Sequence, residues 1–346
     1  MRAQKVAAYV IIISFTIALL VIGKPFLVPL FLAIVIWYLI NSINELLRKI
    51  SWINTHIPNG LTLMISSILM LAVLFLFGNL IAQNIELMRI QAPSYRLNIE
   101  HQAQRILSIL GLEQQYSLNS LATEFNLNDY LGRLINSITG TTQRIFLILV
   151  YVIFLLIEQD TFPKKIAALS WTKERKQNFK TILAHINEAT RTYLVVKFGA
   201  SILTAVLSFM VLSFFKVDFP VFWAFVIFLF NFIPTIGSIV ATAFPALVAL
   251  IQFDTLVPFF GVLIGIIIIQ ILIGSLLEPR LLGNSLNISP LVIVLSLVLW
   301  GIIWGVVGML LCVPLTVIMI IVMAEFPNTR PIAILLSKKG RIGRLS

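Results

Sequence analysis

Long uninterrupted apolar runs are the feature of this sequence that most limits how the chain can fold. They recur along the chain, and 59% of the residues are hydrophobic while only 11% are charged. Soluble domains carry about 25% charged residues, and a chain of this size still exposes roughly a quarter of the surface of its unfolded state. Lipid must therefore cover apolar side chains that a water-exposed surface could not carry, which indicates a membrane protein.

The apolar runs predict an all-α, polytopic helical membrane protein with about eight transmembrane helices, because one crossing needs about 20 apolar residues. The first two runs are joined by Gly23, Lys24 and Pro25 and are expected to form a helical hairpin. Helix breakers interrupt two runs in the C-terminal half, at 231–234 and at Gly301, Gly305, Gly308 and Pro314, so broken or re-entrant segments are expected there. The expected crossings are 6–22, 26–40, 61–80, 145–157, 193–215, 221–251, 256–277 and 291–323.

Basic residues set the expected orientation. The net charge is +11, but Lys and Arg lie between apolar runs and not on one domain, which argues against nucleic-acid binding. The most basic stretch runs from Lys164 to Arg191, whereas acids and arginines balance in the polar segment 81–143. Because Lys and Arg gather in cytoplasmic loops and face anionic lipid there, the basic stretch, the loop around Arg48 and both termini are expected in the cytoplasm.

These features divide the chain into five expected parts. They are an N-terminal transmembrane hairpin plus a third span (1–80), a polar helical extracytoplasmic segment (81–143), a fourth span with a basic cytoplasmic helix (144–192), a C-terminal transport core (193–325) and a basic cytoplasmic tail (326–346).

Enzyme signatures are missing from the sequence. It contains no phosphate-binding loop, zinc-protease helix or nucleophile elbow. His56, His101 and His185 lie in three different polar loops, and Cys312 lies alone inside an apolar run. We therefore expect a protein that is not an enzyme, with no metal site and no cofactor.

A polar stripe marks the fifth expected crossing. Lys197, Ser201 and Thr204 follow Tyr193 at helical spacing, which places them on one helix face. Such a stripe inside a membrane faces protein or water, because an ionisable side chain there costs about 2.5 to 3.5 kcal/mol on insertion scales. The alternative is that the hydroxyl residues are packing residues and that Lys197 reaches to the inner interface.

Two further clusters combine polar groups with a proline. In the sequence NFIPTIGS at 231–238, Pro234 removes a backbone donor and predicts a broken helix, or else a kink. In LLEPRLLG at 276–283, Glu278 and Arg280 flank Pro279 and form either a structural pair or a charged gate. Interrupted apolar helices indicate a transport site. The candidate pathway residues are Lys197, Ser201, Thr204, Asn231, Pro234, Gly237, Ser238, Glu278, Pro279, Arg280 and Gly283.

These clusters also carry a resemblance. Together with YLVVKFGASILT at 193–204 and SPLVIVLSLVLWGIIWGVVGMLLCVPLT at 289–316, they resemble the autoinducer-2 exporter family over nearly the whole chain. The resemblance implies a multi-pass exporter of the bacterial cytoplasmic (inner) membrane, with the quorum-sensing signal autoinducer-2 as the nominal substrate. It also implies homo-oligomers, pentamers among them, and cation/proton antiport has been proposed for other members.

Three functions are consistent with the sequence. The leading hypothesis is a secondary transporter that exports a small polar solute, driven by protons, sodium or the solute's own gradient. A monovalent cation/proton antiporter is the rival, although Glu158, Asp254 and Glu278 all fall at the ends of expected spans. A membrane scaffold or regulator without transport is the third, and it gives no reason for the broken helices. The expected partners are the solute, protons or sodium, membrane lipids and further copies of the chain, and no nucleic acid.

Overall fold

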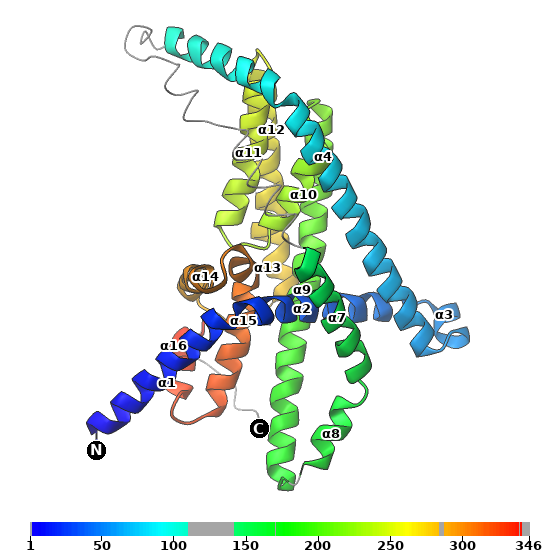
Figure 1. The fold of residues 1–346 in the computed structure, drawn as a ribbon, viewed down its shortest axis with the longest axis vertical. Helices are drawn as coiled ribbons and strands as arrows, with labels where there is room; N and C mark the ends of the chain where they lie inside the picture. Colours follow the sequence, from blue (N-terminus) through cyan, green and yellow to red (C-terminus); the bar gives the residue numbers. More distant parts are fainter. Residues whose placement is uncertain (1, 110–141, 170, 284–286, 339, 341–346) are drawn as a thin grey trace. The chain divides into compact units, whose positions relative to one another are not determined.

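In the computed structural model, helices make up most of the residues that the structure describes, which are 2–109, 142–169, 171–283, 287–338 and 340 (Figure 1). No strand occurs in this part of the chain, so the all-α prediction is confirmed for it. In chain order the helices are α1 (Arg2–Ile22), α2 (Lys24–Arg48), α3 (Ser51–His56), α4 (Asn59–Ile109), α7 (Thr142–Glu158), α8 (Phe162–Ala168), α9 (Lys173–Phe214), α10 (Pro220–Phe230), α11 (Ile236–Gln252), α12 (Leu256–Gln270), the π-helix η1 (Ile271–Leu277), α13 (Glu278–Leu282), α14 (Pro290–Trp304), α15 (Val306–Glu325) and α16 (Arg330–Leu336).

Length and composition identify the helices that can cross a membrane. Among the described residues, five qualify, and six do if the pair 145–158 and 162–168, bent by 58°, counts as one crossing. Three more apolar helices, α10, α11 and α14, have fewer than the ~20 residues of a full crossing. The polytopic membrane class is therefore confirmed, while the count of eight crossings stays a prediction. The five are Lys24–Arg48, Asn59–Met88, Lys173–Phe214, Leu256–Leu282 and Val306–Glu325.

The chain divides into two compact units that interleave in sequence. Unit 1 comprises Met1–Ser66, Gln143–Val196 and Leu282–Ser346, and unit 2 comprises Ser67–Thr142 and Lys197–Leu281. Helices α4 and α9 run from one unit into the other. The long helix α4 has 51 residues and would extend for about 75 Å, so much of it lies beyond the ~30 Å hydrocarbon core. The polar segment expected after the third span therefore begins as a direct continuation of that span, and its residues 110–141 lie outside the described part.

In unit 1, the first two apolar runs do not form the expected hairpin. Gly23 keeps a helical conformation, with φ −73° and ψ −5°. Its N–H donates to the Leu19 carbonyl, and its own carbonyl accepts from Leu27, so helical hydrogen bonds continue on both sides. Pro25 lies in the first turn of α2, where a missing N–H costs nothing. The chain therefore bends between α1 and α2 and does not reverse.

In unit 2, α10 and α11 form a helical hairpin. The side chain of Gln252, at the end of α11, accepts from the Asp218 N–H at 2.8 Å and donates to the Lys216 carbonyl at 2.9 Å, just before α10 begins. Trp223 and Phe244 stack between the two helices. The segment 221–251, expected as a single interrupted crossing, is thus broken at 231–235 and turns back on itself, so both of its ends lie together.

Helix α12 and its continuation pack antiparallel to the second half of α9. Gly261 lies against Phe215, and Gly265 lies against Val211. An added Cβ at either glycine would meet these side chains, so the glycines leave the room in which the Phe215 and Val211 side chains pack. Farther along, Ala200 packs with Ile269 and Ile273. The two helices therefore run side by side in opposite directions, and the hairpin α10–α11 packs against α12.

A second helical hairpin, α14–α15, lies in unit 1. The Trp300 indole donates to Thr316 at 3.3 Å across it. The break falls at Gly305, one of the four interruptions expected in this run, whose φ of 69° favours glycine, and not at Pro314. Pro314 lies inside the unbroken helix α15, because a single missing N–H is tolerated in a helix packed against its neighbours.

Candidate functional site

The polar stripe of α9 forms one buried face in unit 2. Lys197, Ser201 and Thr204 are all buried, and the row continues to Ser208, one turn farther on. Thr204 donates to the Ala200 carbonyl at 2.9 Å, which satisfies its hydroxyl within the helix. The Ser208 hydroxyl finds no partner among the described residues. Ser208 was not among our candidates, although its spacing of four residues from Thr204 would have identified it.

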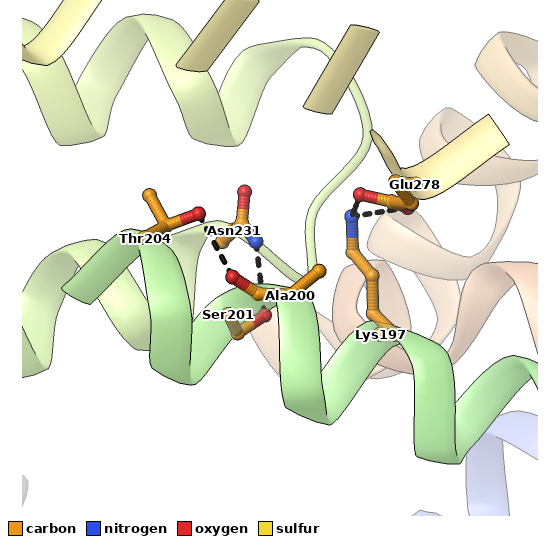
Figure 2. Close-up of polar contacts among 6 residues, drawn as sticks. All are labelled: Lys197, Ala200, Ser201, Thr204, Asn231 and Glu278. Atoms are coloured by element: carbon orange, nitrogen blue, oxygen red, sulfur yellow. Dashed lines mark hydrogen bonds and ion pairs between the residues drawn. The ribbon is translucent and has the colours of Figure 1, made fainter. Parts of the chain in front are cut away.

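The tip of the α10–α11 hairpin meets this row. Asn231, the residue that ends α10, donates its amide N–H to the Ser201 hydroxyl at 2.9 Å (Figure 2). Both residues are buried, and they lie 30 positions apart in the chain. Since about 20 Å of α9 separates Ser201 from the C-terminal end of that helix, the hairpin carries its tip deep along α9.

The tip itself is closely packed and strained. Thr235 has φ 58° and ψ −60°, and the Ile236 N–H donates across it to the Pro234 carbonyl at 2.6 Å, which is a γ-turn of the rare positive-φ form. A β-branched residue in this conformation costs about 1–3 kcal/mol. Gly237 lies so near α10 that an added Cβ would come within 1.8 Å of the Phe230 carbonyl oxygen. Strain of this kind persists only where the surroundings fix it, and it concentrates at functional sites.

One turn from Ser201, Lys197 pairs with Glu278 across the α9–α13 contact. The ammonium lies 2.8 Å from Oε1 and 2.9 Å from Oε2, and the two side chains are only 8% and 13% exposed (Figure 2). The partner of Glu278 is thus Lys197 and not Arg280, which is exposed. Antiparallel packing of α9 and α13 explains the difference, because it brings together residues 81 positions apart.

The π-helix η1 positions Glu278. A residue that precedes a proline is usually pushed out of the α region, but Glu278 has φ −58° and ψ −49° and continues the helix. Its N–H donates to the Ile273 carbonyl, five residues back, as a π-helix requires. The wider turn makes room for the proline ring, which would otherwise clash with the carbonyl four residues before it. A π-turn of this kind has no reliable sequence signal.

The remaining candidates lie away from this contact. Ser238 donates to the Thr235 carbonyl at 2.8 Å, within the first turn of α11. Pro279 and Arg280 are exposed, and Gly283 ends α13 with a positive φ of 52°. In the part of the chain that the structure describes, no three His, Cys, Asp or Glu side chains gather as a metal site would need.

The arrangement joins an ion pair to a row of hydroxyl and amide groups. Buried polar groups in a membrane protein line a pathway or are bonded to one another, because lipid offers them no partner. Here the row follows α9 and is met by the broken helix end at Asn231. Broken helix ends of this kind are where secondary transporters expose polar groups to their solutes.

Comparison with known proteins identifies the family. A sequence profile described as "AI-2E family transporter" matches residues 9–328. Two proteins named "Putative transport protein" are similar over most of their length. The one from Haemophilus influenzae is 30% identical over 341 residues, which is 96% of this chain and 94% of that protein. The one from Borreliella burgdorferi is 28% identical over 321 residues, or 92% and 86%. The "AI-2 transport protein TqsA" of Escherichia coli is 31% identical over 320 residues, or 90% of this chain and 88% of that protein. The resemblance seen in the sequence is thereby confirmed, and the chain belongs to the AI-2E family of membrane transporters.

Proposed function

We propose that this protein is a secondary transporter that exports a small polar solute along the polar face of α9 in unit 2. The observation that supports the proposal most directly is the hydrogen bond between Asn231 and Ser201, which brings a broken helix end onto a buried row of hydroxyl groups. Autoinducer-2 is the first solute to test, because a relative that is 31% identical carries that substrate in its name.

The distribution of basic residues supports a location for the protein. We place the protein in the bacterial cytoplasmic membrane as a multi-pass protein with its C-terminus in the cytoplasm, because Lys and Arg gather in the tail and in the stretch from Lys164 to Arg191. The N-terminus was expected on the same side, but that side requires the α1–α2 hairpin, which does not form. The many exposed apolar side chains can be covered by lipid or by further copies of the chain, since homo-oligomers are associated with the family. Cross-linking in native membranes would distinguish these two possibilities.

Solute flux in proteoliposomes tests the proposal. The vesicles are loaded with autoinducer-2, and its exit is followed for the wild type, Ser201→Ala and Asn231→Ala. We expect each substitution to lower the flux at least about tenfold, which corresponds to about 1.4 kcal/mol of barrier. Ser213→Ala is the matched control, since Ser213 is an exposed serine near the end of the same helix.

Stability has to be measured beside flux, because each substitution also removes one half of a buried hydrogen bond, worth about 1–3 kcal/mol. Flux is therefore compared only among variants that remain folded at the assay temperature. If autoinducer-2 does not leave the vesicles, a panel of small polyols, amino acids and organic acids replaces it. Wild-type flux in both Ser201→Ala and Asn231→Ala would remove the polar face from the pathway, and no flux of any solute by the wild type would favour a scaffold.

A further inference from the structure

The pair of Lys197 and Glu278 is isolated among apolar helices. Lys197 is the only charged residue of 197–214, and the packed segments 220–252 and 256–277 contain none. Arg280, on the same short helix as Glu278, is exposed. Tyr193, one turn before Lys197 on α9, is buried but carries no charge at neutral pH. Each of the two charges therefore depends on the other.

A carboxylate in such surroundings needs a positive charge beside it. An unpaired buried carboxylate takes up a proton, and its pKa can rise to about 8–9. Many secondary transporters meet this need with a sodium ion, which unwound backbone carbonyls and the C-terminal ends of broken helices coordinate. Here both oxygens of Glu278 lie within 2.9 Å of the Lys197 ammonium, so the compensating charge is covalently attached to the chain.

The nearby broken helix end is also poorly suited to a sodium ion. The carbonyl of Leu229 accepts from the Phe232 N–H, that of Phe230 from Ile233, and that of Ile233 from Gly237. The Pro234 carbonyl accepts from the Ile236 N–H and from the Thr235 hydroxyl. Four carbonyls of the tip, those of Leu229, Phe230, Ile233 and Pro234, are therefore already engaged in the turn.

We infer that Lys197 is a tethered cation that takes the place of a coupling sodium ion at Glu278, so that transport along this face is independent of sodium. The inference rests on the proposed function in that the polar face is taken as the pathway. It predicts a specific gain of function. Removing the ammonium while keeping the carboxylate should create a sodium-binding site where the wild type has none.

Thermal unfolding of the purified full-length protein tests this prediction without a transport assay. The wild type, Lys197→Met and Lys197→Met/Glu278→Gln are melted in sodium, potassium and choline chloride at equal ionic strength. All melts use the same buffer at about pH 9, since alkaline pH favours the ionised form of a buried carboxylate. We expect sodium to raise the melting temperature of Lys197→Met by about 3 °C or more above its value in choline, as an ion that binds only the folded state does. The wild type and the double variant should melt alike in all three salts.

Two results would overturn the inference: a sodium-specific rise in the wild type, or none in Lys197→Met. If Lys197→Met does not fold, the inference is tested by the solute flux of the wild type and of Lys197→Arg. The flux of each protein should be unchanged when choline replaces sodium on both sides of the vesicle. A tenfold or larger fall in the flux of the wild type would refute the tethered cation. A wild type that carries no solute at all would instead refute the proposed function, and the melting curves would still test the pair.

Discussion

At the scale of single residues, the hairpin tip leaves no room for one methyl group. A Cβ at Gly237 would lie 1.8 Å from the Phe230 carbonyl oxygen, and that oxygen belongs to backbone that cannot move alone. We expect Gly237→Ala to destabilise the protein by about 1–3 kcal/mol through overpacking. Gly199→Ala, on α9 with open space around the new Cβ, should instead raise stability by about 0.5–1 kcal/mol. Thermal unfolding in one detergent compares them, and equal melting temperatures would contradict the tip geometry.

Substituting the two charged residues beside Pro279 should have very different effects on the stability of the protein. Glu278→Gln leaves the Lys197 ammonium buried without a partner, which typically costs about 3–5 kcal/mol. Arg280 is exposed, so Arg280→Gln should change stability by less than about 0.5 kcal/mol. Exchanging the partners, as Lys197→Glu/Glu278→Lys, should recover part of the loss. Chemical denaturation measures all three, and a strong effect of Arg280→Gln would restore the original Glu278–Arg280 pair.

At the level of the helices, the substitution Pro234→Ala distinguishes the contribution of the hairpin tip to solute flux from its contribution to stability. Alanine at this position restores a backbone donor and relaxes the strained turn at Thr235. This relaxation offsets the loss of the Asn231–Ser201 hydrogen bond, so the free energy of unfolding should change little. Flux should nevertheless fall, because the relaxed tip no longer holds Asn231 against Ser201. Pro245→Ala, inside α11, is the control for losing a proline from the same hairpin. Normal flux in Pro234→Ala, measured in proteoliposomes, would show that the tip conformation is not needed.

The sequence predicts those features of the site that depend on neighbouring residues in the chain. Spacing alone places Lys197, Ser201 and Thr204 on one face, and Pro234 alone predicts that the helix breaks. The direction of the chain after the break depends on Gln252 reaching back to Lys216, a contact between residues 36 positions apart that no local pattern encodes. The partner of Glu278 likewise depends on the register of two packed helices, so the nearest basic residue in the sequence was the wrong choice.

For the whole molecule, the antiparallel pairing of helices determines which segments cross the membrane and on which side each loop lies. Because α9 and α12 are antiparallel within unit 2, the segment between them must begin and end on the same side of the bilayer. A single interrupted crossing at 221–251 would make α9 and α12 parallel, which the contacts of Gly261 and Gly265 with the end of α9 exclude. The hairpin α14–α15 likewise returns to the side on which it began, so it does not change the side of the membrane on which the C-terminal tail is expected.

Cysteine labelling tests this membrane topology directly. In a Cys312→Ala background, cysteines at Lys216 and Asp254 should both react with a membrane-impermeant maleimide in intact cells, because both positions flank the α10–α11 hairpin, whose two ends we propose to lie outside the cytoplasm. A cysteine at Ser94, in the extended part of α4, should react in the same way. A cysteine at Ser170, within the basic stretch from Lys164 to Arg191, should react only after the membrane is permeabilised. The decisive position is Asp254. If it is protected in intact cells while Lys216 reacts, then 221–251 crosses the bilayer once and the hairpin is refuted. If all four positions react from outside, the cytoplasmic placement of the basic stretch is refuted instead.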